Sequence, residues 1–540
     1  MNIRRFYSCA MLLCLLMGGT PLLTGCADSE HMNEIVNNKP SGGEEPYSDE
    51  VTEKLMKVPG VSDVTMHVST KDSTIRGYYF FVNQPVDHKN PAKGTFAQRC
   101  YLQLSGYDKP VVLETEGYNM PGNIDSVEVG DLTEYLQANY LLVEYRYFGK
   151  SLPEDFYDTN FTYLYSDQAA ADLHAVVKLM QQYMFPRSNK WVSTGISKGG
   201  INTTLYAYYS DKNGWDDIDL FVPFCAPFIT DSAGICPGEK VGEYLISTCG
   251  SGYPETSVED SAYQRLRAIP AAICTNQTLR DAILREFHHQ QEGYYSEILS
   301  YFGDKDLEKT ATAGVLHTFY DNLFGHFSTF SFDSWAKFVP DLDKAIAPDA
   351  SEDDIDEMVA FVYLCDRTLA DVIKAFEKQS GETRSPYDDR TIPEFRRAVP
   401  SMPYYLQAYR ELGSYKLDFS LVDGTWLTPQ LAQKVSYLRS NEYMYGMRYP
   451  NQYDGGRLMT DVHNWAKTVS TKPLVFIYSR NDPWTGAGIS DDAADSSRKV
   501  WKIINKIGTH DNQFLDKTIC DAEASQAIKD AIDSVLGLKK

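Results

Sequence analysis

The short stretch around Ser197 constrains the fold of this chain more than any other feature. An apolar segment at 190–194 (KWVST) runs into GISKGG at 195–200, and a helix-forming segment (NTTLYAYYS) follows after Ile201. A G-x-S-x-G string between a strand and a helix is typical of a nucleophile elbow, where glycines leave room for a sharp turn and the serine hydroxyl is presented. The pattern predicts a strand, turn and helix of an α/β fold, with Ser197 as the candidate nucleophile.

Apolar strand-like segments alternate with amphipathic helices over the first half of the chain, and they return near its end. This alternation is typical of a largely parallel sheet. Between about 230 and 464 the sequence has long helical stretches and few strand-like ones, so we expect a sheet interrupted by a helical insertion. The expected strands are 77–82, 98–104, 111–115, 140–145, 190–194, 220–224, 472–478 and 500–504, and the clearest helices are 166–184 and about 522–536.

The N-terminal residues have the character of an export signal. Arg4 and Arg5 precede an apolar run that is too short for a confident membrane span, and LTGC at 23–26 resembles the lipobox of bacterial lipoproteins. Cys26 would then be acylated, and the polar residues that follow would form a flexible tether. We therefore expect a lipoprotein signal peptide at 1–25, a tether at 26–50, sheet-forming segments at 51–230 and 466–540, and a helical insertion at 231–465. The protein would be exported and anchored to a bacterial membrane, on its periplasmic or cell-surface side.

The charge of the chain argues against a nucleic-acid partner. There are 74 acidic and 51 basic residues, a formal charge of −23, and no local basic run offsets this balance. Neither the histidines nor the cysteines have the spacing of a metal site, so we expect neither a metal nor a cofactor.

A serine nucleophile needs a general base and an acid that orients it. In the chain order Ser, Asp, His, the acid follows a late strand, and Asp482 stands just after the expected strand 472–478. His510 is the only histidine beyond Asp482. We expect Ser197, Asp482 and His510 to form the catalytic triad.

An oxyanion hole requires two backbone N–H donors. One comes from the residue after the nucleophile, here Lys198, and the other from a loop that follows an earlier strand. That loop is ETEGYN at 114–119, and the N–H of Tyr118 is our candidate for the second donor. The loop lacks the His-Gly found in many lipases and esterases, which weighs against a lipid-ester substrate.

Several strings together resemble known serine peptidases. QPVDH at 84–88, EYRYFGKS at 144–151 and QAYREL at 407–412 resemble the Pro-X carboxypeptidase and dipeptidyl peptidase II family. GISKGG at 195–200, TEGYN at 115–119 and NDPW at 481–484 are instead similar to the sister family of secreted bacterial tripeptidyl aminopeptidases. The resemblance spans roughly 75 to 515.

This resemblance implies an α/β-hydrolase fold with a large helical cap inserted between the nucleophile half and the Asp/His half. It also implies a serine exopeptidase that forms an acyl-enzyme and releases short peptides, most often tripeptides, from free N-termini, commonly with a proline preference. A Pro-X type carboxypeptidase or an esterase of the same fold is the alternative. A third possibility is a surface-anchored protein that captures peptides without cleaving them. Peptides are the expected partners, and the oligomeric state stays open.

An aminopeptidase must also hold a positively charged α-amino group, a task that suits buried carboxylates. Glu411, Glu116 and Glu144 are the candidates. Each also has a structural alternative, because buried carboxylates often stabilise a fold; for Glu411 this is an ion pair, for example with Arg146.

Overall fold

The computed structural model describes residues 49–153, 161–188, 190–230, 261–285, 312–313, 315–316, 341–362, 402–413, 454–480, 482–508 and 510–538. The expected signal peptide, Cys26 and almost all of the tether lie outside these residues. Among the described residues, no helix is both long enough and apolar enough to cross a bilayer.

The chain divides into two compact units. One comprises Glu34–Thr230 and Gly456–Lys540, and the other Met1–Asn33 and Asp231–Gly455. The first unit resumes at Gly456, earlier than the position 466 expected from the sequence. The reason is that helix α19 (Arg457–Thr468) packs on this unit: its Trp465 donates a hydrogen bond to Asp211.

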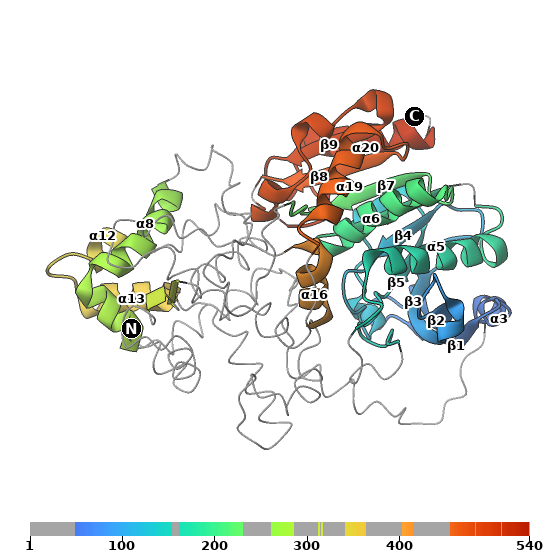
Figure 1. Cartoon of the computed structure of the whole chain (residues 1–540), viewed down its shortest axis with the longest axis horizontal. Helices are drawn as coiled ribbons and strands as arrows, with labels where there is room; N and C mark the ends of the chain where they lie inside the picture. Colours follow the sequence, from blue (N-terminus) through green and yellow to red (C-terminus); the bar gives the residue numbers. More distant parts are fainter. Residues whose placement is uncertain are drawn as a thin grey trace, which may run out of the picture. The chain divides into compact units, whose positions relative to one another are not determined.

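A nine-stranded mixed sheet forms the centre of the first unit (Figure 1). Its order is β1-β2-β3-β5-β4-β6-β7-β8-β9; the pairs β1–β2, β2–β3 and β3–β5 are antiparallel, and the other neighbours are parallel. The strands are β1 (Val61–Val68), β2 (Arg76–Pro85), β3 (Thr95–Gln103), β4 (Val111–Thr115), β5 (Asn139–Val143), β6 (Trp191–Ile196), β7 (Leu220–Phe224), β8 (Leu474–Ser479) and β9 (Val500–Asn505).

This sheet confirms the expected α/β-hydrolase fold. All eight expected strands are present with ends shifted by a few residues, and β4 and β7 begin and end where expected. Strand β1 was missed. It lies at the sheet edge with most of its side chains at least partly exposed, so its sequence shows no buried alternation.

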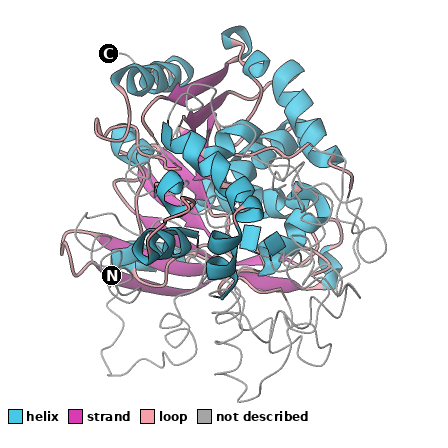
Figure 2. Ribbon diagram, turned by 90° about the vertical axis from the view of Figure 1, so that its left-hand side faces the viewer, coloured by secondary structure: helices cyan, strands magenta, loops and turns pink. Residues whose placement is uncertain are grey.

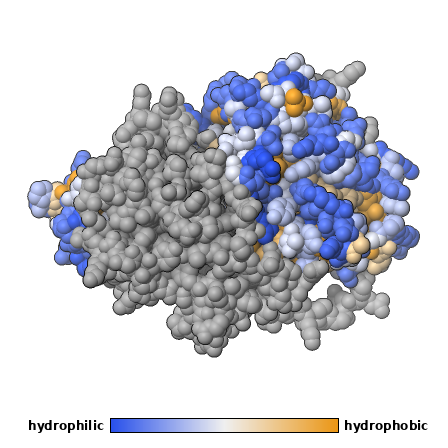
Figure 3. Space-filling model, in the orientation of Figure 1, coloured by the Kyte–Doolittle hydropathy of each residue, from blue (hydrophilic) through white to orange (hydrophobic). Residues whose placement is uncertain are grey.

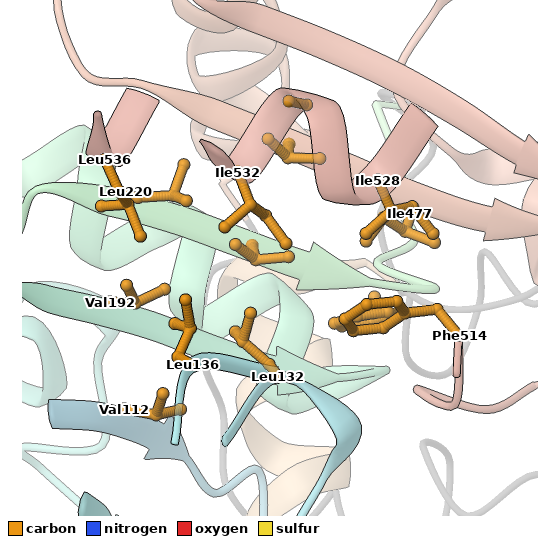
Figure 4. Close-up of a cluster of buried hydrophobic side chains, with 14 of the residues drawn as sticks. Val112, Leu132, Leu136, Val192, Leu220, Ile477, Phe514, Ile528, Ile532 and Leu536 are labelled. Atoms are coloured by element: carbon orange, nitrogen blue, oxygen red, sulfur yellow. The ribbon is translucent and has the colours of Figure 1, made fainter. Parts of the chain in front are cut away.

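Helices cover both faces of the sheet (Figure 2). On one face, α4 (Asp131–Leu136) and α20 (Ala522–Leu536) place Leu132, Ile528 and Ile532 over strand residues such as Val192, as Figure 4 shows. Burying such side chains stabilises the fold by roughly 1.5–3 kcal/mol each.

The opposite face is covered by α6 (Lys198–Asn213), and α5 (Ser166–Tyr183) packs beside it. The ring of Tyr206 on α6 lies against the ring of Phe221. Side chains alternate along a strand, and the neighbours Leu220 and Val222 belong to the cluster of Figure 4, so Phe221 points to the opposite face. The face of this unit seen in Figure 3 is mainly hydrophilic with scattered apolar residues.

Short helices complete the first unit: α3 (Glu50–Met56), η1 (Pro91–Lys93), η2 (Ile124–Ser126), η8 (Pro483–Ala487), η9 (Asp491–Ala493) and η10 (Ser496–Arg498). In the second unit the described elements are all helical. They include α8 (Ser261–Thr275), α12 (Leu342–Ala345), α13 (Glu352–Val362), α16 (Met402–Gln407) and the π-helical turn η6 (Ala408–Leu412), which continues α16.

Candidate active site

Ser197 occupies the turn between β6 and α6. Its φ of 56° and ψ of −120° are rarely adopted by a residue with a side chain, and its N–H donates to the carbonyl of Phe224 at 3.0 Å. The flanking glycines allow this turn. A Cβ on Gly195 would lie 2.6 Å from the Gly199 carbonyl oxygen, and one on Gly199 would lie 2.5 Å from that of Thr115. The turn therefore has the close packing of a nucleophile elbow.

His510 and Asp482 meet beyond the ends of neighbouring strands. Asp482 follows β8, His510 follows β9, and His510 Nδ1 lies 2.8 Å from Asp482 Oδ2. The other carboxylate oxygen accepts the N–H of Trp484 at 3.0 Å. Both side chains are buried, and within the described part of the chain His510 Nε2 has no hydrogen-bond partner. The histidine is thus held by an acid on one side, with its second nitrogen available.

Cys225, which the sequence did not single out, lies beside this pair. It follows β7 with a φ of 48°, and its N–H donates to the carbonyl of Ile477 at 2.8 Å. Burial and the charges of Asp482 and Asp511 raise the pKa of its thiol well above the ordinary value. In the described residues, Cys225, Asp482 and His510 are the one group whose ligand atoms, within 4.8 Å of one another, suit a metal ion. The sequence signal that could have identified Cys225 is its position directly after β7, the strand between β6 and β8.

The loop after β4 carries two N–H groups that meet one carboxylate oxygen. Glu116 Oε1 accepts the N–H of Gly117 at 2.9 Å and that of Tyr118 at 3.2 Å. Burial raises the pKa of Glu116, against the lowering effect of these two donors and of the Lys198 charge. The expected second oxyanion donor, Tyr118, is therefore bound to Glu116 in this structure.

The Lys198 side chain reaches the same loop. Its Nζ donates to the carbonyl of Gly117 at 2.6 Å and lies 3.4 Å from the centre of the Tyr145 ring. Lys198 is 1% exposed. We expected only its backbone N–H, at the start of α6, to take part in the site.

Glu144 is fully buried, and both of its carboxylate oxygens are engaged. Oε1 accepts the N–H of Met120, and Oε2 accepts the N–H of Lys150 and the hydroxyl of Ser151 at 2.8 Å. This geometry favours a structural role and does not favour the substrate-binding role that we expected for Glu144.

Arg146 pairs with Asp172. Its Nε and Nη2 bind the two carboxylate oxygens at 2.7 and 2.8 Å. Glu411 belongs to the other unit, where its Oε1 accepts a hydrogen bond from Gln407 Nε2 at 3.0 Å.

Known proteins similar to this chain are peptidases and hydrolases. Residues 44–232 match the family model described as PS-10 peptidase S37. A prolyl tri/tetrapeptidyl aminopeptidase of Streptomyces mobaraensis is 25% identical over 477 residues, which cover 86% of this chain and 81% of that protein. The serine protease vicPb of Bipolaris victoriae (strain FI3) is 34% identical over 202 residues, which cover 33% of this chain and 38% of that protein.

Among solved structures, an esterase of Pyrobaculum calidifontis matches with a TM-score of 0.20 and 16% identity, over 31% of this chain and 50% of the esterase. These comparisons support the resemblance that the motifs implied, to the S37 and tripeptidyl aminopeptidase serine peptidases.

Proposed function

We propose that this protein is a serine exopeptidase that releases short peptides, most often tripeptides, from free N-termini, with a preference for proline-containing substrates. The name of the Streptomyces mobaraensis relative, a prolyl tri/tetrapeptidyl aminopeptidase, supports the N-terminal direction, the proline preference and the peptide length. The observation that carries the chemistry is the buried His510–Asp482 pair, whose Nε2 stays available in the same unit as the Ser197 turn.

In the proposed reaction, Ser197 Oγ attacks the scissile carbonyl carbon while His510 Nε2 takes the hydroxyl proton. Asp482 holds the imidazole by Nδ1 and stabilises the cation that forms. The C–N bond then breaks, and the proton passes from His510 to the leaving amine. Water hydrolyses the resulting acyl-enzyme by the same proton transfers in reverse. The tetrahedral oxyanion is bound by the N–H groups of Lys198 and Tyr118.

Labelling with a fluorophosphonate probe tests the nucleophile. We expect the probe to label the wild-type protein but not Ser197→Ala, and peptide cleavage to be lost in the same variant. The non-enzymatic reading, peptide capture without cleavage, predicts that the wild-type protein is not labelled. Full peptidase activity in Ser197→Ala would disprove the mechanism.

The direction of attack is tested with free and N-acetylated forms of one fluorogenic tripeptide amide. We expect the acetylated form to be cleaved far more slowly, because it lacks the charged α-amino group. Equal rates would contradict an aminopeptidase. Turnover of blocked peptides with free C-termini, or of short acyl esters, would instead support the carboxypeptidase or the esterase. Mass spectrometry of a digested peptide library then gives the length released and the residue preference.

Glu116 and Glu411 are the proposed acceptors of the substrate's ammonium group. Glu116 is supported by its place in the loop beside Ser197's helix, where Asn202 Nδ2 also binds its carbonyl. The variants Glu116→Gln and Glu411→Gln show which of the two carboxylates binds the ammonium group. The variant that lacks the true acceptor loses discrimination between free and acetylated peptide. A variant that keeps this discrimination excludes the residue it replaces.

We also propose that the protein is a lipoprotein anchored through Cys26. The apolar run after Arg4 and Arg5 and the LTGC string support this. Radiolabelled palmitate should be incorporated by the wild-type protein in a bacterial host, and not by Cys26→Ser. Incorporation by the variant would contradict the proposal.

A further inference from the structure

We propose that the side chain of Lys198 positions and polarises the peptide group whose N–H binds the oxyanion. The proposal rests on the function above, and it assigns a second task to a residue whose backbone alone was expected to act. Both oxyanion donors would then depend on Lys198, one through its own N–H and the other through its side chain.

The carbonyl of Gly117 and the N–H of Tyr118 belong to one peptide group. Lys198 Nζ donates to that carbonyl oxygen at 2.6 Å, a charge-assisted hydrogen bond. A cation at the oxygen draws electron density from the peptide nitrogen, so the N–H at the other end becomes a stronger donor. The ammonium therefore acts on the oxyanion through the peptide and need not touch the substrate.

An aromatic cage keeps the Lys198 ammonium in place. Nζ lies 3.4 Å from the centre of the Tyr145 ring, 5.2 Å from that of Phe148 and 5.6 Å from that of Tyr118. Cation–π attraction in such a desolvated site offsets part of the cost of burying the charge. The charge is thus confined beside the loop, where little water screens it.

The loop lies directly against the start of α6. A Cβ on Gly117 would approach Lys198 Cβ to 2.9 Å and the backbone nitrogen of Gly199 to 3.0 Å, so a larger residue would push the loop away. Close contact of the loop with the first turn of α6 brings the donors from both segments to one side of Ser197.

The loop is already arranged to bind an anion. The N–H groups of Gly117 and Tyr118 converge on a single oxygen of Glu116 in the unliganded chain. We infer that the substrate oxyanion takes the place of this oxygen at the Tyr118 N–H when the Glu116 carboxylate turns away.

The test compares Lys198→Met with the wild-type protein by using a peptide aldehyde and the matching peptide alcohol. The aldehyde forms a tetrahedral adduct with the serine and carries an oxyanion, whereas the alcohol does not. Both inhibition constants are measured by competition with fluorophosphonate labelling, so no peptide turnover is needed. Removing one oxyanion donor costs 10²–10³-fold in rate, so removing a group that acts through a donor should cost roughly 10–100-fold.

We expect Lys198→Met to weaken binding of the aldehyde by roughly 10–100-fold and binding of the alcohol by less than about threefold. The value of kcat should fall in proportion to the loss of aldehyde affinity, and KM should be nearly unchanged. Lys198→Arg, which keeps the charge, should recover part of the loss. The proposal would be overturned if binding of both inhibitors were weakened equally, or if binding of neither were weakened.

Lys212→Met is the matched control. Lys212 lies on the same helix, donates to the hydroxyl of Tyr208 at 2.9 Å and lies 4.7 Å from its ring centre, away from the loop. We expect it to leave both inhibition constants unchanged. If Lys198→Met does not fold, Tyr145→Leu removes the nearest ring and keeps the lysine, and it should shift the aldehyde constant alone. A wild-type protein that binds the aldehyde tightly but cleaves no peptide would contradict the exopeptidase and leave the role of Lys198 measurable.

Discussion

His510 Nδ1 lies 2.8 Å from Asp482 Oδ2, although 28 residues separate the two positions in the chain. The second oxygen of Asp482 is held by the N–H of Trp484, so the carboxylate cannot rotate without losing a hydrogen bond. An imidazole that donates from Nδ1 to this carboxylate has Nε2 available as the base that the proposed reaction needs.

Asp482→Asn should reduce kcat by about 10⁴-fold, with a small effect on folding. An asparagine oxygen can still accept the N–H of Trp484, but its amide group would donate to His510 Nδ1. That donation stabilises the wrong tautomer, in which Nε2 already carries a proton and so cannot accept the proton of the serine. Steady-state cleavage of a tripeptide amide measures the loss.

Asp516→Asn is a suitable control for this substitution. Asp516 Oδ1 accepts the N–H of Thr518 at 2.8 Å, the same local turn as Asp482 with Trp484, but it lies on the surface. Activity should be unchanged in this variant. A kcat for Asp482→Asn within tenfold of the wild type would show that Asp482 does not orient the base.

Ser197→Gly should unfold at a higher temperature than Ser197→Ala, although both variants lack the hydroxyl of the proposed nucleophile. The backbone at this position has a φ of 56° and a ψ of −120°, which glycine adopts with little strain and alanine does not. Relief of this strain is worth about 1 kcal/mol or more. Thermal unfolding of the two variants measures the difference.

The same pair of substitutions at Ser193 provides the comparison. Ser193 lies in strand β6 and is buried in extended backbone, where glycine is less stable than alanine by about 0.5–1 kcal/mol. The order of stability should therefore reverse. If Ser197→Gly were also the less stable variant, the turn would not store strain.

The parts of the site that could be predicted from the sequence follow from local pattern and chain order. Glycine at 195 is required in part within the motif, because its Cβ would meet Gly199, whereas glycine at 199 is required by the close approach of Thr115 at the end of β4. Asp482 and His510 follow consecutive strands of a parallel sheet, and such strand ends lie at one edge. Their close approach therefore needs only the correct assignment of β8 and β9.

The roles of the remaining charged residues could not be predicted, because their partners come from distant segments. Glu116 and Glu144 each follow a strand of the sheet, yet only Glu144 meets a turn, at 149–151, that supplies donors for one of its oxygens. Arg146 binds Asp172 on α5, a partner 26 residues away in the chain. The residue after the serine in G-x-S-x-G can have any side chain, so nothing local shows that the Lys198 ammonium is buried among aromatic rings.

Gly199→Ala should reduce both activity and stability. The added Cβ would lie 2.5 Å from the carbonyl oxygen of Thr115, so either the loop after β4 or the start of α6 must shift. Because this shift separates the two proposed oxyanion donors, we expect a loss of kcat of at least 10²-fold. Thermal unfolding and peptide cleavage on the same samples measure both effects.

Gly214→Ala serves as its control at the other end of α6. Gly214 has a φ of 68°, and a Cβ there meets no atom within 4 Å. This variant should lose about 1 kcal/mol of stability from backbone strain alone and keep full activity. Wild-type activity in Gly199→Ala would show that the loop and the helix need not touch.

Glu144 makes the stability of the fold depend on pH. Burial raises its pKa to about 7, although the nearby Arg99 charge, the Ser151 hydroxyl and two backbone N–H groups lower it. In the unfolded chain the pKa has its ordinary value near 4.5. The folded protein therefore binds a proton more strongly than the unfolded chain, so this contribution is complete below pH 4.5 and is lost as the pH rises through 7.

Glu144→Gln should remove this dependence. We expect the free energy of unfolding of the wild-type protein to carry a term that falls by up to about 1.4 kcal/mol per pH unit between pH 4.5 and 7, and the variant to lack that term. Denaturant unfolding at several pH values gives both slopes. Glu53→Gln, a change at an exposed residue of α3, should keep the wild-type slope. A Glu144→Gln slope equal to that of the wild type would mean that this carboxyl group stays ionised throughout, held by Arg99 and its hydrogen-bond donors.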